Sequence, residues 1–284
     1  MVTATKTRAK KAEAPTLDGA ASRLVRKNFG NGHAYYLDGV KLDGVTTLMG
    51  DGMRKAALEN WAGNVTAEYA VDNWAELQNM APSARLNTLK KARFSVRDEA
   101  ARRGSEVHEL ADQISNGREV LVPDEIAGYV TSAVRFLDDW QIRPILSETS
   151  CYSIKGMYGG TLDGVATSAV WDEKCGEKRV ILFDWKTNRT GIYGETALQL
   201  AGYANADAYV GDDGLDHPMA ELGITDHWAV WVRSDGYDVY PMDNSEDTYR
   251  TFQYVATVAR RTGGKDKPLD RLKGDALYVP GGTR

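Results

Sequence analysis

The segment Val180-Ile181-Leu182-Phe183-Asp184-Trp185-Lys186-Thr187 is a nearly unbroken apolar run that ends in a carboxylate and an amine. A short apolar run of this kind is typical of a buried strand. Side chains two residues apart in a strand share a face, so we expect Asp184 and Lys186 to emerge side by side, with Trp185 pointing the other way. A divalent cation and an attacking water could lie between the two groups. The alternative is a simple ion pair at a strand end.

A second carboxylate lies one predicted hairpin earlier, in the motif Gly159-Gly160-Thr161-Leu162-Asp163-Gly164. Because a sheet brings neighbouring strands together, Asp163 can converge with Asp184. Two carboxylates from adjacent strands form a hard-oxygen site suited to Mg²⁺ or Mn²⁺. Glu148, at the start of the same predicted meander, is a further acidic candidate. The alternatives are a turn at Asp163 and an ordinary edge-strand residue at Glu148.

Helical spacing selects four more residues. Gln199 and Tyr203 are one helical turn apart, so they share a face from which they could reach a phosphate or orient the lysine. Gly104 and His108 are spaced in the same way; the glycine allows a close approach, and imidazole is the commonest nitrogen ligand of catalytic metals. The alternatives are a satisfied buried Gln–Tyr pair and a structural histidine.

The positions of Gly and Pro and the periodicity of apolar residues along the chain predict a mixed α/β (α+β) fold with a helical N-terminal region. After Pro144 the pattern changes to short β-like runs, which predicts an antiparallel meander, then a helix and further strands. This order favours a mixed central sheet with helices packed on it. The expected helices are 56–73, 84–114, 123–140, 195–209 and 246–261; the expected strands are 145–154, 158–170, 179–186, 228–233 and 237–241, with a hairpin at 33–42.

The charge balance limits how this chain could hold a polyanion. Its 284 residues carry a formal net charge of −5, which argues against binding nucleic acid by overall positive charge. Any such contact must be local, and Lys and Arg cluster at 6–11, 85–103 and 260–273. No apolar run approaches the roughly 20 residues that span a bilayer, and the start of the chain lacks a secretory signal. We therefore expect a cytoplasmic protein with no membrane partner.

Five motifs, taken in their order along the chain, point to a family. They are Arg103-Gly104-x-x-x-His108, Glu148, Gly160-Thr161-x-Asp163, Asp184-Trp185-Lys186-Thr187 and Gln199-x-x-x-Tyr203. In this order they resemble the RecB-like branch of the PD-(D/E)XK nuclease superfamily, especially phage-type and CRISPR-associated exonucleases. The resemblance covers about residues 100 to 210.

The resemblance implies a role for each of these residues. It implies that a Mg²⁺ or Mn²⁺ ion is bound by His108, Asp163, Asp184 and the backbone carbonyl of Trp185. It implies that Lys186 positions or activates water, that Gln199 and Tyr203 support the site, and that Glu148 is a further catalytic candidate. Many relatives carry four cysteines around an iron–sulfur cluster, whereas this chain has only Cys151 and Cys175, so we expect no cluster.

The resemblance also implies a fold and a function. We expect a restriction-endonuclease-like mixed central sheet in a nuclease core at 144–262. We expect three further parts: a disordered basic arm at 1–15, a mostly helical part at 16–143 that carries His108, and a tail at 263–284. The expected function is metal-dependent exonucleolytic cleavage of single- or double-stranded DNA at its ends, in phage DNA recombination, repair or processing, with a single-strand annealing protein or recombinase as partner. The alternatives are a structure-specific endonuclease and a non-cleaving DNA-binding recombination or scaffold protein.

Overall fold

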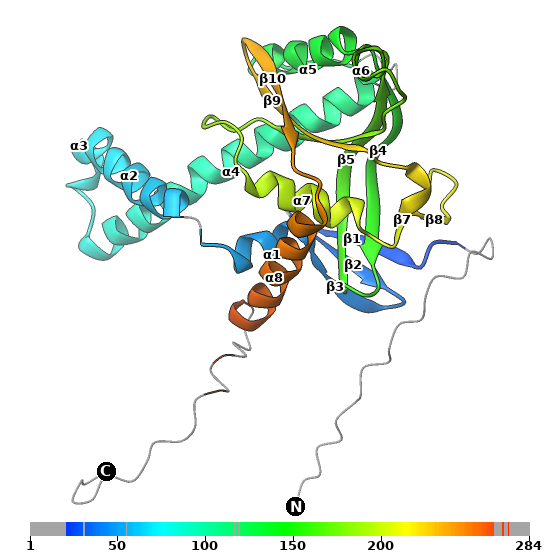
Figure 1. Cartoon of the computed structure of the whole chain (residues 1–284). Helices are drawn as coiled ribbons and strands as arrows, with labels where there is room; N and C mark the ends of the chain where they lie inside the picture. Colours follow the sequence, from blue (N-terminus) through cyan, green and yellow to red (C-terminus); the bar gives the residue numbers. More distant parts are fainter. Residues whose placement is uncertain are drawn as a thin grey trace, which may run out of the picture.

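The computed structural model of the chain describes residues 21–30, 32–54, 56–115, 118, 120–263, 269 and 272 (Figure 1). The predicted arm at 1–15 and most of the tail at 263–284 lie outside these residues. The described part is a mixed α/β structure in which helices flank a curled sheet of ten strands. Among the described residues, no helix has the length and apolar character to cross a membrane.

The centre of the sheet is an antiparallel meander, as predicted. Strands β4 (Ile142–Ser153), β5 (Tyr158–Ser168) and β6 (Ile181–Lys186) pair in sequence order. Strand β6 also pairs in parallel with β9 (Asp226–Arg233), which pairs with β10 (Gly236–Met242). The sheet is therefore mixed, because parallel and antiparallel neighbours meet at β6.

Three strands of the predicted N-terminal helical part belong to this sheet. They are β1 (Leu24–Phe29), β2 (Gly32–Leu37) and β3 (Val40–Gly44), and β3 pairs in parallel with the beginning of β5. The hairpin of β2 and β3 is confirmed, with Asp38 and Gly39 both at positive φ, as a tight hairpin turn requires. Strand β1 was not predicted because only its first residue is buried, which leaves no alternating apolar signal.

Two groups of helices cover the two faces of the sheet. Helices α1 (Val45–Gly52), α7 (Glu195–Ala204) and α8 (Glu246–Thr262) pack on one face around Leu162, Val165 and Leu182. Helix α5 (Ala127–Asp139) and the C-terminal part of α4 (Pro82–Ser115) pack on the other. Ile181, Phe183 and Trp185 point to this second face, so Leu182, Asp184 and Lys186 point to the first.

The N-terminal part of α4 belongs to an arm. Helix α4 has 34 residues, a length of about 50 Å at the usual rise per residue. Its first half projects from the body and carries α2 (Ala56–Asp72) and the short α3 (Trp74–Leu77) (Figure 1). The second half of the same helix returns to the sheet, where it carries His108.

Two predicted elements are wrong in extent. The helix expected at 195–209 ends at Ala204, because Ala208 pairs with Tyr152 and forms the short edge strand β7 (Ala208–Val210), next to β8 (Asp216–Pro218). The strand expected to reach residue 170 ends at Ser168. There the Ser168 hydroxyl accepts the N–H of Trp171 and caps α6 (Ala169–Cys175). A 3₁₀ turn (Met219–Leu222) precedes β9.

Candidate metal and active site

The candidate site is a cavity of about 520 Å³ that opens where β5 and β6 separate. The two strands pair from Ala166 to Gly164, opposite Ile181 to Phe183, and the ladder ends there. Beyond that point the N–H of Trp185 donates to the carboxylate of Asp163 at 2.7 Å in place of a backbone partner. Side chains from α4, α7 and β4 reach the opening from different sides of the sheet.

Asp184 and Lys186 lie side by side on β6, as the strand spacing predicts, and form an ion pair. Asp184 is 2% exposed. Gln199 on α7 bridges the pair: its amide nitrogen donates to Asp184 at 2.6 Å and its amide oxygen accepts from the Lys186 ammonium at 3.1 Å. The Gln199 nitrogen also donates to the hydroxyl of Tyr203 at 3.2 Å. The predicted pair on one helix face therefore orients both charged groups.

His108, Glu148 and Asp163 form a second cluster in the same cavity. One ligand atom from each lies within 4.8 Å of the other two, and His108 Nδ1 is 3.6 Å from the Asp163 carboxylate. Glu148 stands opposite Asp163 in the register of β4 and β5, with a φ of +45°. A non-glycine residue held in this region costs about 1–3 kcal/mol, which the surrounding structure must offset.

The metal ligands implied by the family resemblance are brought together in part. His108 and Asp163 lie in the cluster just described, but the third residue that meets them is Glu148. Asp184 is outside that cluster, and its carboxylate is engaged by Lys186 and Gln199. Sequence spacing could not predict whether Glu148 or Asp184 would join His108 and Asp163, since β4 and β6 both pair with β5.

Burial and mutual repulsion raise the pKa of two carboxyl groups in the cavity. Burial, with the charges of Asp163 and Asp112, raises the pKa of Glu148 to about 7. Burial and the charge of Asp184 also raise the pKa of Asp163. Burial alone would lower the pKa of Lys186, but the nearby carboxylates outweigh it and the pKa is raised. The Lys186 amine therefore stays charged, whereas burial and repulsion disfavour the ionised forms of Glu148 and Asp163.

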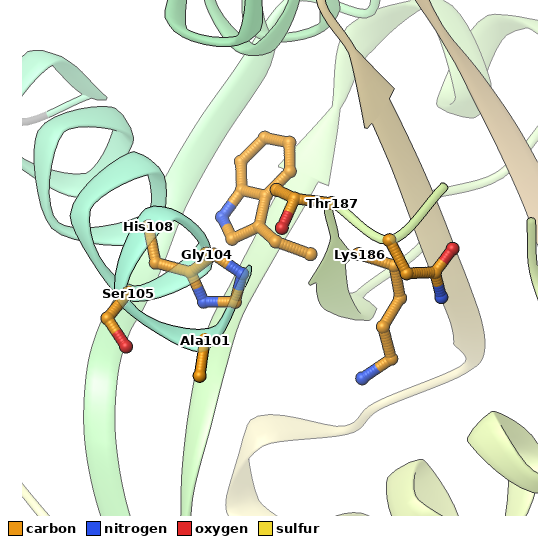
Figure 2. A pocket seen from close by; sticks show the side chains of 8 residues that line it. Ala101, Gly104, Ser105, His108, Lys186 and Thr187 are labelled. Atoms are coloured by element: carbon orange, nitrogen blue, oxygen red, sulfur yellow. The ribbon is translucent and has the colours of Figure 1, made fainter. Parts of the chain in front are cut away.

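A smaller cavity of about 330 Å³ adjoins the site between α4 and the segment that follows β6. Figure 2 shows His108 and Lys186 on the two sides of this cavity, with Gly104 and Ser105 on the helical wall. A Cβ atom on Gly104 would lie 3.1 Å from the hydroxyl of Thr187, which is tighter than an ordinary contact. The glycine therefore lets α4 approach the end of β6, as its spacing from His108 predicts.

Several arginines of the basic stretch at 85–103 contact other residues of the protein rather than remaining unpaired. Arg85 donates to three backbone carbonyls around the end of α3 at 2.8, 3.0 and 3.1 Å. Arg97 pairs with Asp98 at 2.6 Å and Arg102 with Glu106 at 3.3 Å. In the last cluster, Arg260 pairs with Asp43 and donates to the turn between β4 and β5. Arg85 and Arg260 therefore connect segments of the fold through backbone carbonyls, whereas Arg97 and Arg102 remain exposed in surface ion pairs.

Sequence reasoning missed one wall of the cavity. Arg26 and His33 from the β1–β2 hairpin, with Tyr35 and Thr161, line it opposite α4. A local sequence signal for these residues was present. His33 and Tyr35 are two residues apart and share one face of a strand, and Thr161 precedes Asp163 by two residues. Their convergence depends on the parallel pairing of β3 with β5, which no local pattern indicates.

The chain matches no known protein-family model, and no curated protein matches it. What the site can do therefore follows from its own geometry and from the resemblance of its motifs.

Proposed function

We propose that the chain is a metal-dependent deoxyribonuclease of the PD-(D/E)XK type that removes nucleotides from DNA ends. The observation that carries this proposal is the convergence of Asp163, Asp184 and Lys186 in one cavity with His108 and Glu148. These five residues come from four different elements, so their meeting is not a consequence of sequence proximity. A protein that only binds DNA has no chemical reason to place a buried Asp–Lys pair beside a further pair of carboxylates and an imidazole.

The donor set fits a divalent cation. Glu148, Asp163 and His108 offer two hard oxygens and one nitrogen within 4.8 Å of one another. The raised pKa of both carboxyl groups reflects repulsion and burial that a bound cation would relieve. We propose Mg²⁺ or Mn²⁺ as the ion, held by these three residues, with Asp184 orienting Lys186 rather than acting as the principal ligand. Such an ion supplies a Lewis acid for the phosphoryl group.

Lys186 is the hydrogen-bond donor to the attacking water and to the phosphate. Its ammonium group is charged and is held by Asp184 and Gln199, so it can donate to the attacking water and to the negative charge that develops on the phosphate. Loss of one such preorganised donor lowers the rate by ~10²–10³ in comparable sites. Gln199 and Tyr203 are positioning residues, because Gln199 contacts the Asp184–Lys186 pair and Tyr203 accepts a hydrogen bond from Gln199.

A timed digest tests this function. The purified chain is incubated with Mg²⁺ or Mn²⁺ and end-labelled linear duplex, single-stranded DNA or a covalently closed circle. We expect linear DNA to be degraded and closed circles to survive. Asp163→Asn should be inactive, and Lys178→Met, which removes an exposed lysine that does not line the cavity, should retain wild-type activity. Cutting of closed circles would favour the endonuclease alternative, and DNA binding without cleavage by wild type would contradict the proposal.

A further inference from the structure

The β1–β2 hairpin contributes a chain of hydrogen bonds that runs from the cavity mouth to β5. Arg26 contacts His33 Nδ1 at 3.4 Å, His33 Nε2 contacts the Tyr35 hydroxyl at 3.0 Å, and that hydroxyl contacts the Thr161 hydroxyl at 2.8 Å. Three of these residues belong to the hairpin, and the fourth lies on the strand that carries Asp163. The hairpin wall is thereby tied to the candidate site.

The chemistry of Arg26 fixes the direction of this chain. A guanidinium group only donates, so His33 Nδ1 must accept and the Nε2 atom of the neutral ring must carry the proton. The ring then donates to Tyr35, and Tyr35 donates to Thr161. Burial and the charge of Arg26 lower the pKa of His33, in agreement with a neutral ring. His33 and Tyr35 therefore act as a brace that restricts the orientation of the guanidinium group.

Arg26 is a cation beside an acidic cavity. Its side chain is exposed, and it forms no ion pair with any carboxylate in the described residues. It lines the cavity together with Glu109, Asp112 and Glu148. Among the described residues, its guanidinium group makes one hydrogen bond, to His33, and the residue is exposed. This combination suits an anionic ligand that enters the cavity from the hairpin side.

We propose that Arg26, braced by His33, binds a backbone phosphate of the DNA strand that flanks the phosphate being cleaved. The inference rests on the proposed function and adds a substrate subsite to it. Arg26 lines the same cavity as Glu148, Asp163 and Lys186, so the subsite adjoins the reacting position. A polyanion that enters a cavity lined by Glu148 and Asp163 needs a nearby cation. A guanidinium fork matches the oxygens of a phosphate in two-point contact.

Binding measurements on full-length variants test the subsite. A labelled single-stranded oligonucleotide is titrated in Ca²⁺, with a denaturing gel to verify that it stays intact, at several salt concentrations. Arg26→Gln should weaken binding about tenfold and reduce the slope of log K against log salt by about 0.7, the value for one lost phosphate contact on a single strand. Lys27→Gln is the matched control: it removes the same charge one residue away, on the opposite face of β1, where Lys27 lies over the ring of Tyr36.

Replacing single phosphates by uncharged methylphosphonates locates the contact. In wild type, one position next to the cleavage site should be sensitive to the replacement, and Arg26→Gln should lose that sensitivity at that position alone. Equal effects of Arg26→Gln and Lys27→Gln, or no sensitive position, would overturn the subsite while leaving the nuclease proposal intact. A wild-type chain that neither binds nor cleaves DNA would instead overturn the proposed function, and the subsite with it.

Discussion

The carboxylate of Asp163 accepts the backbone N–H of Trp185 at 2.7 Å, at the point where β5 and β6 stop pairing. A side chain thus satisfies a buried donor that the ladder leaves behind. The same carboxylate faces His108 and Glu148, so one group both holds the strands at their point of separation and contributes to the candidate metal cluster.

Two substitutions of Asp163 separate these roles. Asp163→Asn keeps an oxygen acceptor for Trp185 and removes the charge, so it should abolish cleavage with little loss of stability. Asp163→Ala leaves the N–H without a partner and should cost a further ~1–3 kcal/mol of unfolding free energy. Urea denaturation of both variants measures the difference. Equal stability of the two would mean that the hydrogen bond contributes nothing.

The Asp184–Lys186 pair should behave as a buried ion pair. Lys186→Met leaves a carboxylate that is 2% exposed without its cation, and we expect a loss of roughly 3 kcal/mol together with the loss of cleavage. The double variant Asp184→Asn/Lys186→Met removes both charges and should recover most of the stability while remaining inactive. A double variant as unstable as the single one would contradict this account.

Metal preference tests the nitrogen ligand. We expect Mn²⁺ to support cleavage at least as well as Mg²⁺, because Mn²⁺ accepts an imidazole more readily, and Ca²⁺ to support binding without cleavage. His108→Ala should lose most activity and need higher metal concentrations for the remainder. Cleavage rates against each metal provide the measurement. An unchanged Mn²⁺ to Mg²⁺ ratio with unchanged metal affinity would remove His108 from the ligands.

Metal binding should depend on pH through Glu148. Burial and neighbouring charges raise the pKa of this carboxyl to about 7 in the metal-free protein, so below that pH a proton must leave before the cation binds. Affinity should therefore rise with pH by up to about tenfold per unit below about 7 for each proton displaced, and level off above it. Calorimetry in buffers of different ionisation enthalpy counts the released protons. Glu148→Gln should weaken binding and reduce that count, and an unchanged count would contradict the assignment.

The purified protein should be colourless and active without anaerobic handling. Cys151 is buried, with burial raising the pKa of its thiol to about 12, and Cys175 is exposed on α6, whereas iron–sulfur clusters are usually held by four thiolates. Absorption spectra and iron analysis check this expectation. A visible charge-transfer band with stoichiometric iron would show that it is wrong.

The sequence by itself determined the parts whose signals are local. The apolar run before Asp184 predicts a buried strand, the two-residue spacing puts Asp184 and Lys186 on one face, and the four-residue spacing does the same for Gln199 and Tyr203. Asp38 and Gly39 predict the hairpin turn. These features depend on backbone geometry within one element, so a periodic pattern is sufficient to predict them.

Only the tertiary structure decided which elements meet. The pairing of β3 with β5 brings Arg26 and His33 to the cavity, and the pairing of Ala208 with Tyr152 ends α7 five residues before the predicted end. The pairing of β4 with β5 brings Glu148 to His108 and Asp163. The physical reason is that strand partners are selected by contacts between segments far apart in the chain, whose net free energy no local propensity reports.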